Sequence, residues 1–259
     1  MKKFSDFTEP VICTFAQGYT CGSLAAKITR ALYDGTDAVG VYFHHVKQEE
    51  RTDEKIKYVF SLCADRPIYA LSYRGRENEG KTDDEIGEEL VRLGALGAST
   101  VDVMGDLFAP CFSQLTDDKA AIDKQKDLIK RIHDTGAEVL MSSHIQKYLS
   151  AKEVEEMMAE QYSRGADFAK VVSRCDSEEE QRASIETVLH LKSVFKDKPF
   201  LFLTMGPYTR LLRLIGPLLG CRVWLAVDDH TDGDTIAQPD LKTIKRIRDS
   251  VDLRPYKRY

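Results

Sequence analysis

Eight short runs of apolar and β-branched residues recur along the chain, and this repeat limits its fold more than any other feature. Longer charged and amphipathic segments separate the runs, which begin about 25 to 40 residues apart. Alternating strands and helices predict a parallel sheet. Eight such units predict an α/β protein with a closed (β/α)8 barrel, the TIM barrel, as a single domain over residues 1–259. The runs lie at residues 11–15, 38–43, 67–73, 99–104, 137–143, 167–172, 199–205 and 222–227.

The segments between the runs carry helix signals. The segment that starts at Thr82 has Glu85 three positions on, and the segment that starts at Ser150 has Glu153, so each pair predicts a capping box. An open, doubly wound sheet is the main alternative fold, but it usually begins with a glycine-rich phosphate loop. The stretch QGYTCGS at 17–23 is neither GxGxxG nor a P-loop. We therefore favour the barrel and expect no nucleotide cofactor.

Composition places the chain among ordinary globular proteins. It has 259 residues, of which 42% are hydrophobic and 31% are charged, a length that suits one barrel. The net charge of −5 argues against nucleic acid as a partner, because a phosphate-binding surface needs a basic excess. We expect no membrane span and no signal peptide, because no apolar run approaches roughly 18 residues and MKKFSDFTEP has no apolar core. Six scattered cysteines without a CxxC pair predict reduced thiols, no zinc site and a cytoplasmic location.

Lys170 is the most informative candidate for chemistry. In the strand predicted around it, Phe168, Lys170 and Val172 share one face. A lysine inside a barrel loses solvation, which lowers its pKa and favours the neutral amine. A neutral amine can attack a ketone or aldehyde to form a Schiff base. The alternative interpretation is that Lys170 pairs with a buried carboxylate or extends to solvent from the strand end.

Two further candidates stand near the carboxyl ends of neighbouring strands, where a β/α barrel places its active site. His144 follows the fifth run, and at that position it could move protons for a Schiff-base intermediate, although it could equally be an exposed or capping histidine. Arg213 follows the seventh run, and an arginine at a barrel mouth can bind a substrate carboxylate, although on a helix it could also face water.

Four motifs in chain order resemble those of type I 3-dehydroquinate dehydratase. The strand that ends in S-x-H matches Ser142 to His144, and the a-D-i-x-K strand matches Ala166 to Lys170. The M-G segment with an arginine eight residues after the methionine matches Met205, Gly206 and Arg213. The third-strand pattern matches PIYALSYRGRENEGK, with Pro67, Arg74, Glu79 and Gly80. The resemblance covers nearly the whole chain.

This resemblance implies a (β/α)8 barrel, usually a homodimer, that needs neither a cofactor nor a metal and acts on a small carboxylated ketone. Lys170 would form the imine, His144 would act as general acid and base, and Arg213 would bind the substrate carboxylate. Glu79 would position His144 or a substrate hydroxyl. Our further candidates for substrate binding are Arg74, Tyr42, Thr231 and Gln238. Arg74 matches the third-strand pattern, Thr231 and Gln238 are loose counterparts of residues in the family's final loop, and Tyr42 stands where the family has an arginine.

The departures from the family pattern concern substrate recognition. The family's second strand ends in E-x-R-x-D, whereas this chain has Gly40 and Tyr42 in place of the glutamate and arginine. The fourth-strand D-x-E becomes Asp102 and Met104, and the final loop, DDHTDGDTIAQ, is acidic. Loss of one charged hydrogen bond costs roughly 1.5–3 kcal/mol, enough to change the preferred substrate. We therefore expect the imine-forming centre to be retained and the pocket around it to be altered.

Four functional hypotheses remain open. The first is a Schiff-base dehydratase that acts on 3-dehydroquinate or a related keto acid. The second is a class I aldolase-like enzyme that uses the same imine for C–C cleavage. The third is a degenerate homologue that binds a shikimate-like ligand without turnover. The fourth, which we disfavour, is a metal enzyme with ligands from the strand 8 and strand 2 ends, namely Asp228, Asp229, His230 and His44.

Overall fold

The computed structural model describes residues 2–230 and 237–251. Each of the eight apolar runs forms a strand within one or two residues of its predicted limits. The strands are β1 (Val11–Ala16), β2 (Ala38–Tyr42), β3 (Ile68–Leu71), β4 (Thr100–Met104), β5 (Glu138–His144), β6 (Phe168–Arg174), β7 (Phe200–Met205) and β8 (Val223–Val227). The prediction of eight strands is confirmed.

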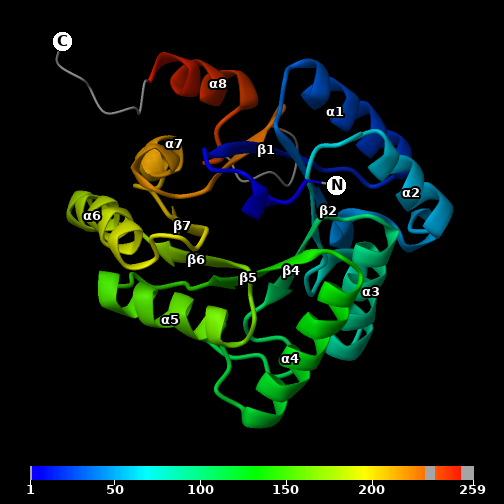
Figure 1. Cartoon of the computed structure of the whole chain (residues 1–259), viewed down its shortest axis with the longest axis horizontal. Helices are drawn as coiled ribbons and strands as arrows, with labels where there is room; N and C mark the ends of the chain where they lie inside the picture. The colour runs from blue at the N-terminus through cyan, green and yellow to red at the C-terminus, as the bar shows by residue number, and fades with distance from the viewer. Residues whose placement is uncertain (1, 231–236, 252–259) are drawn as a thin grey trace.

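The strands form one parallel sheet in the order β7-β6-β5-β4-β3-β2-β1-β8. The sheet curls so that its two end strands approach each other, and the backbone N–H of Arg222 donates to the carbonyl of Phe200 at 2.9 Å. The result is a nearly closed barrel (Figure 1). The predicted single-domain (β/α)8 barrel is therefore confirmed.

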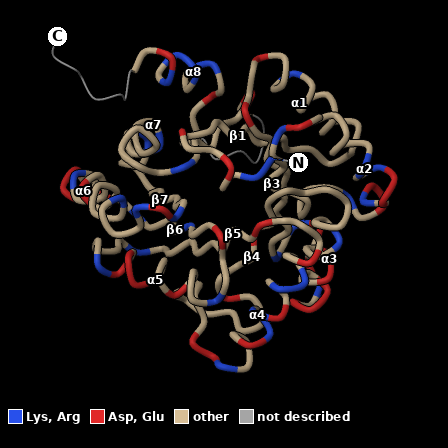
Figure 2. The backbone as a smooth tube through the Cα atoms, in the orientation of Figure 1, with Lys and Arg blue, Asp and Glu red and all other residues tan. Residues whose placement is uncertain are grey.

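Helices surround the strands on the outside, and most of the charged residues lie on this outer layer (Figure 2). Thr82 with Glu85, and Ser150 with Glu153, form capping boxes as predicted. None of the helices described is long and apolar enough to cross a membrane. The helices are α1 (Cys21–Tyr33), α2 (Asp53–Ser61), α3 (Asp83–Leu96), α4 (Lys119–Asp134), α5 (Ala151–Ser163), α6 (Glu178–Val194), α7 (Arg210–Leu219) and α8 (Leu241–Ser250).

The amino end of the barrel is filled by the segment before β1. Its short 3-10 helix, Phe4–Asp6, inserts the fully buried Phe4 ring against Tyr69 and Phe168, with ring centroids 5.8 and 6.1 Å away. The backbone N–H of Phe4 donates to the carboxylate of Glu138 at 2.8 Å, and the Thr100 hydroxyl donates to the same oxygen at 2.7 Å. This plug leaves the opposite, carboxyl end of the strands for the site.

Candidate active site

Lys170 lies inside the barrel, with 4% of its surface exposed. Its Nζ donates to the Tyr69 hydroxyl at 3.3 Å and lies 3.5 Å from Oδ2 of Asp102. Burial lowers the pKa of Lys170, the Asp102 carboxylate opposes that shift, and the Arg213 guanidinium adds to it. The lysine is thus buried as the Schiff-base hypothesis requires, and it also has the carboxylate neighbour of the alternative interpretation.

Asp102 is completely buried on β4 and accepts hydrogen bonds from three hydroxyl groups. Tyr69 and Tyr73 both donate to its Oδ2, Tyr73 at 2.6 Å, and Ser142 donates to its Oδ1 at 2.6 Å. Burial, followed by the charge of Asp102, raises the pKa of both tyrosines well above the ordinary value of 10, so they stay protonated as donors. The register of β5 and β6 sets Ser142 beside Lys170.

His144 ends β5, with its backbone N–H donating to the side-chain oxygen of Gln114 at 2.8 Å. Its ring meets that of Tyr73 edge to face at 5.8 Å, and its nitrogens form no hydrogen bond with any residue in 2–230 or 237–251. Burial lowers its pKa well below 6.5, and the charges of Lys170 and Arg213 lower it further. The imidazole is therefore neutral at neutral pH and can accept a proton.

Arg213 is a buried cation whose bonds within the described residues all go to neutral groups. It lies on the first turn of α7 with 8% of its surface exposed. Its guanidinium donates to the Thr204 carbonyl at 2.9 Å and to the Thr209 hydroxyl at 3.0 Å, and no carboxylate among the described residues pairs with it. Burial lowers its pKa to about 10, so it is still charged at neutral pH. A buried, uncompensated cation favours an anionic ligand.

Gln161 of α5 fixes the backbone of Lys170. Its carboxamide accepts the Lys170 N–H at 3.1 Å, and donates to the Lys170 carbonyl and to the Ser143 hydroxyl, both at 3.1 Å. The side chain is completely buried. Sequence analysis did not identify Gln161, although a signal exists: it continues the apolar stripe of Val154 and Met158 at helical spacing.

The β1–β2 side of the barrel is aromatic. A Cβ added at Gly40 would lie 2.5 Å from the Phe15 ring, so that ring occupies the space of a side chain at position 40. Phe15 stacks on Tyr42 with centroids 4.4 Å apart, and Tyr42 stacks on His45 at 5.2 Å. Neighbouring His44 is buried, which lowers its pKa to about 3 and keeps it neutral.

The remaining predicted substrate-binding residues have different surroundings. Arg74 pairs with Asp83 at 2.7 Å and with Asp106 at 2.8 Å, so its charge is already balanced. Glu79 is exposed, and its carboxylate bonds to no residue of the described ranges. Gln238 is buried, and its amide donates to the Ala226 carbonyl at 3.4 Å. Tyr42 lies in the aromatic wall, and Thr231 lies outside the described residues.

The hypothetical metal ligands do not form a cluster. Asp228 and Asp229 lie 3.1 and 3.9 Å from the Arg30 guanidinium, and the His230 ring contacts the Gln238 carbonyl at 2.9 Å. His44 instead accepts the Tyr73 N–H at 3.3 Å. Within residues 2–230 and 237–251, no group of three or more His, Cys, Asp or Glu side chains could hold a metal ion.

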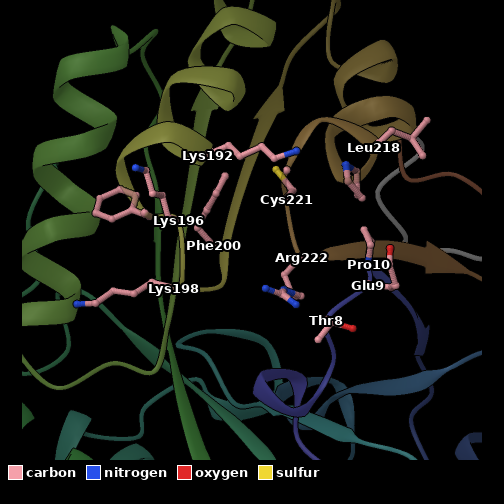
Figure 3. A pocket seen from close by; sticks show the side chains of 13 residues that line it. Thr8, Glu9, Pro10, Lys192, Lys196, Lys198, Phe200, Leu218, Cys221 and Arg222 are labelled. Carbon is pink, nitrogen blue, oxygen red and sulfur yellow. The ribbon is translucent and has the colours of Figure 1, made fainter. Parts of the chain in front are cut away.

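A hollow of about 310 Å³ opens at the amino end of the β7–β8 seam (Figure 3). Lys192, Lys196, Lys198 and Arg222 line it, but their charges do not converge: Lys198 turns towards α5, with its Nζ 4.5 Å from the centre of the Tyr162 ring (Figure 3). We therefore do not regard this hollow as the active site, and Lys170 remains the candidate for catalysis.

Comparison with known proteins identifies relatives of this arrangement. A family model described as Type I 3-dehydroquinase matches residues 12–254. The 3-dehydroquinate dehydratase of Geobacillus kaustophilus superposes with a TM-score of 0.78 at 17% identity, over 95% of this chain and 94% of that one. The type I 3-dehydroquinate dehydratase of Clostridium difficile, in a structure with covalently modified comenic acid, gives 0.75 at 17% identity, over 93% and 92%. A search of curated proteins found no match.

Proposed function

The chain belongs to the type I 3-dehydroquinase family, and on this premise we propose that it is a Schiff-base dehydratase that removes water from a carboxylated cyclic ketone. Family membership supports the dehydratase, and the buried Lys170 amine carries the Schiff-base proposal. Its lowered pKa makes the neutral amine accessible, and Arg213, the buried cation that lowers it further, has no acidic partner among the described residues. A carboxylate bound to Arg213 would hold a ketone near Nζ.

In the proposed reaction the Lys170 Nζ attacks the carbonyl carbon, and the resulting carbinolamine loses water to give a protonated imine. The imine withdraws electrons from the adjacent carbon, which releases a proton. The enamine so formed expels the hydroxyl group of the next carbon, which takes up a proton and leaves as water. His144, neutral in the free protein, would accept and return these protons. A final water molecule hydrolyses the imine.

The pocket wall bears on substrate choice, because the Phe15 ring fills the space beside Gly40 and stacks on Tyr42. We propose 3-dehydroquinate or a related keto acid, with Tyr42 and Gln238 contributing to the binding pocket. Aldolase-like C–C cleavage would start from the same imine, and the products separate the two reactions. Dehydration gives a conjugated ketone that absorbs in the ultraviolet, whereas cleavage of a ring C–C bond opens the ring to one isomeric dicarbonyl compound that lacks this conjugation.

Borohydride reduction in the presence of 3-dehydroquinate tests the proposal. We expect a stable adduct on the peptide that contains Lys170, located by mass spectrometry in the unmodified protein. Lys170→Met should abolish the adduct and turnover, whereas Lys198→Met, at an exposed lysine, should leave both unchanged. Absence of an adduct with 3-dehydroquinate and with other cyclic keto acids would refute imine chemistry and favour a ligand-binding role.

A further inference from the structure

The carboxylate that faces Lys170 has little capacity left to bind it. Each carboxylate oxygen accepts about two hydrogen bonds. Oδ2 of Asp102, the oxygen nearer Lys170, already accepts from Tyr69 and Tyr73, and Oδ1 accepts from Ser142. The Lys170 Nζ stands 3.5 Å from Oδ2, beyond the roughly 2.7–3.2 Å of an ordinary N–H···O bond. Its other bond, to the Tyr69 hydroxyl at 3.3 Å, is also long.

We infer that Tyr73 is a positioning residue for the proposed imine-forming lysine: by occupying a lone pair of Asp102 Oδ2, its hydroxyl prevents Asp102 from holding Lys170 in a close ion pair. Asp102 then remains near enough to stabilise a protonated imine, but it does not trap the lysine as a fully paired ammonium ion. The part of this inference that concerns imine formation rests on the proposed function, whereas the geometry around Asp102 does not depend on it.

The groups around Lys170 determine whether loss of the Tyr73 hydroxyl should raise or lower the pKa of Lys170. Asp102 favours the ammonium form of Lys170, whereas burial and Arg213 favour the amine. Removing the Tyr73 hydroxyl frees a lone pair of Oδ2 for Lys170, strengthens the ion pair and makes the lysine harder to deprotonate. The titratable and charged groups that face Lys170 from the surrounding strands and α7 are Cys13, Tyr69, Asp102, His144 and Arg213.

The two hydroxyl groups differ in a way that gives the inference a graded test. Tyr73→Phe frees Oδ2, which faces Lys170, whereas Ser142→Ala frees Oδ1, the other oxygen. The effect of Tyr73→Phe should therefore exceed that of Ser142→Ala. Two matched controls remove hydroxyl groups elsewhere: Tyr162→Phe loses a bond to the Pro199 carbonyl, and Ser99→Ala loses one to the Ile68 carbonyl.

The experiment titrates the Lys170 Nζ resonance by NMR in the full chain labelled with [15N]lysine, between about pH 6 and pH 11 and without substrate. Lys170→Met assigns the resonance. We expect Tyr73→Phe to raise the midpoint by about one pH unit, Ser142→Ala by less, and the controls not at all. An unchanged or lowered midpoint in Tyr73→Phe, or an effect of Ser142→Ala equal to that of Tyr73→Phe, would overturn the inference.

Borohydride trapping with 3-dehydroquinate is then repeated across the pH range. If the inference holds, adduct formation by Tyr73→Phe needs more alkaline pH than the unmodified protein, and it recovers at high pH. A merely structural role for Tyr73 would lower adduct formation equally at every pH, and would contradict the inference. The NMR midpoints could shift as expected while neither the unmodified protein nor any variant forms an adduct. In that case the proposed function fails, and the role of Tyr73 at Asp102 stands.

Discussion

The two sides of the barrel mouth differ in residue type: one carries ionisable side chains and the other carries aromatic ones. On the β5–β7 side, Lys170 and Arg213 are buried cations and His144 is a half-buried imidazole, and none of the three has a close bond to a carboxylate of the described residues. On the β1–β2 side, Phe15 and Tyr42 stack over a glycine and carry no charge. The contrast teaches that the residues proposed for imine chemistry match the family pattern, whereas the wall beside them departs from it at Gly40 and Tyr42.

Removal of the Arg213 charge should have the largest effect on the ionic side. Arg213→Met deletes the cation proposed to bind the substrate carboxylate, at about 1.5–3 kcal/mol for each charged hydrogen bond, so kcat/KM should fall by about 10²- to 10³-fold. Steady-state kinetics on 3-dehydroquinate measures this loss. Arg210→Met, at an exposed arginine one turn earlier, should retain full activity, and an equal loss in both variants would contradict the assignment.

On the aromatic side, a side chain at position 40 should be tolerated only without the Phe15 ring. Gly40→Ala should destabilise the protein by about 1–3 kcal/mol through overpacking, because its Cβ would lie 2.5 Å from that ring. In a Phe15→Ala background the same change should cost little. Urea unfolding of the four proteins in this cycle measures the coupling, and an equal cost of Gly40→Ala in both backgrounds would show that the Phe15 ring is not the source of the cost.

This cycle also guides any attempt to rebuild a charged wall. Gly40→Glu with Tyr42→Arg would introduce the pair of charged groups that the family pattern has at these positions, but the glutamate would meet Phe15. We expect that pair to regain or increase 3-dehydroquinate activity only when Phe15→Ala is added. Higher activity without Phe15→Ala would contradict the steric argument.

A smaller effect, on the free energy of unfolding, is expected from His44 at acidic pH. The folded pKa of His44 is lowered to about 3 by burial, so between about pH 6.5 and pH 3 the unfolded chain binds a proton there that the folded chain does not. Its contribution to stability is complete above pH 6.5 and is lost as the pH falls. His44→Asn, which keeps an acceptor for the Tyr73 N–H, should reduce the loss of unfolding free energy between pH 7.5 and pH 5.5 by about 1 kcal/mol. Identical pH dependence in both proteins would refute this.

The smallest effect is expected at Glu79. Glu79→Gln should change kcat/KM by less than about twofold, because the carboxylate is exposed and has no partner within the described ranges. Asn78, one residue earlier, is buried and donates to the Ser72 hydroxyl and the Tyr73 carbonyl, both at 2.8 Å, so Asn78→Ala should lower activity more. A tenfold loss in Glu79→Gln would instead support the role that the family resemblance implies.

Sequence pattern predicted the strands well because a strand buried on both faces needs a continuous apolar run, and each run here is short and bounded. It also predicted the capping boxes, since a cap depends on residues three apart. Lys170 was identifiable because its charge interrupts such a run. These features are local, and the residues that make them adjoin one another in the chain.

The missed features depend on distant parts of the chain. Tyr69 reads as an ordinary strand residue, and only the packing of β3 beside β4 shows that its hydroxyl reaches Asp102. Phe15 reads as core, and only its position over Gly40 gives it a role in shaping the wall. Likewise, Gln161 reaches Lys170 through the fold of α5 onto β6. No spacing rule along the chain reports such contacts.

The plug at the amino end of the barrel affects where the protein can be shortened. The family match begins at residue 12, yet Phe4 and Ser5 lie before it and donate to the carboxylate of Glu138. A chain cut at the family boundary would lose only Val11 from the strands and would keep every proposed catalytic residue. Glu138, however, would retain only Thr100 of these donors, and the Phe168 and Tyr69 rings would lose the Phe4 ring that covers them. Tyr69 also contacts Lys170, so removal of residues at the amino end would disturb the packing beneath the Lys170 amine.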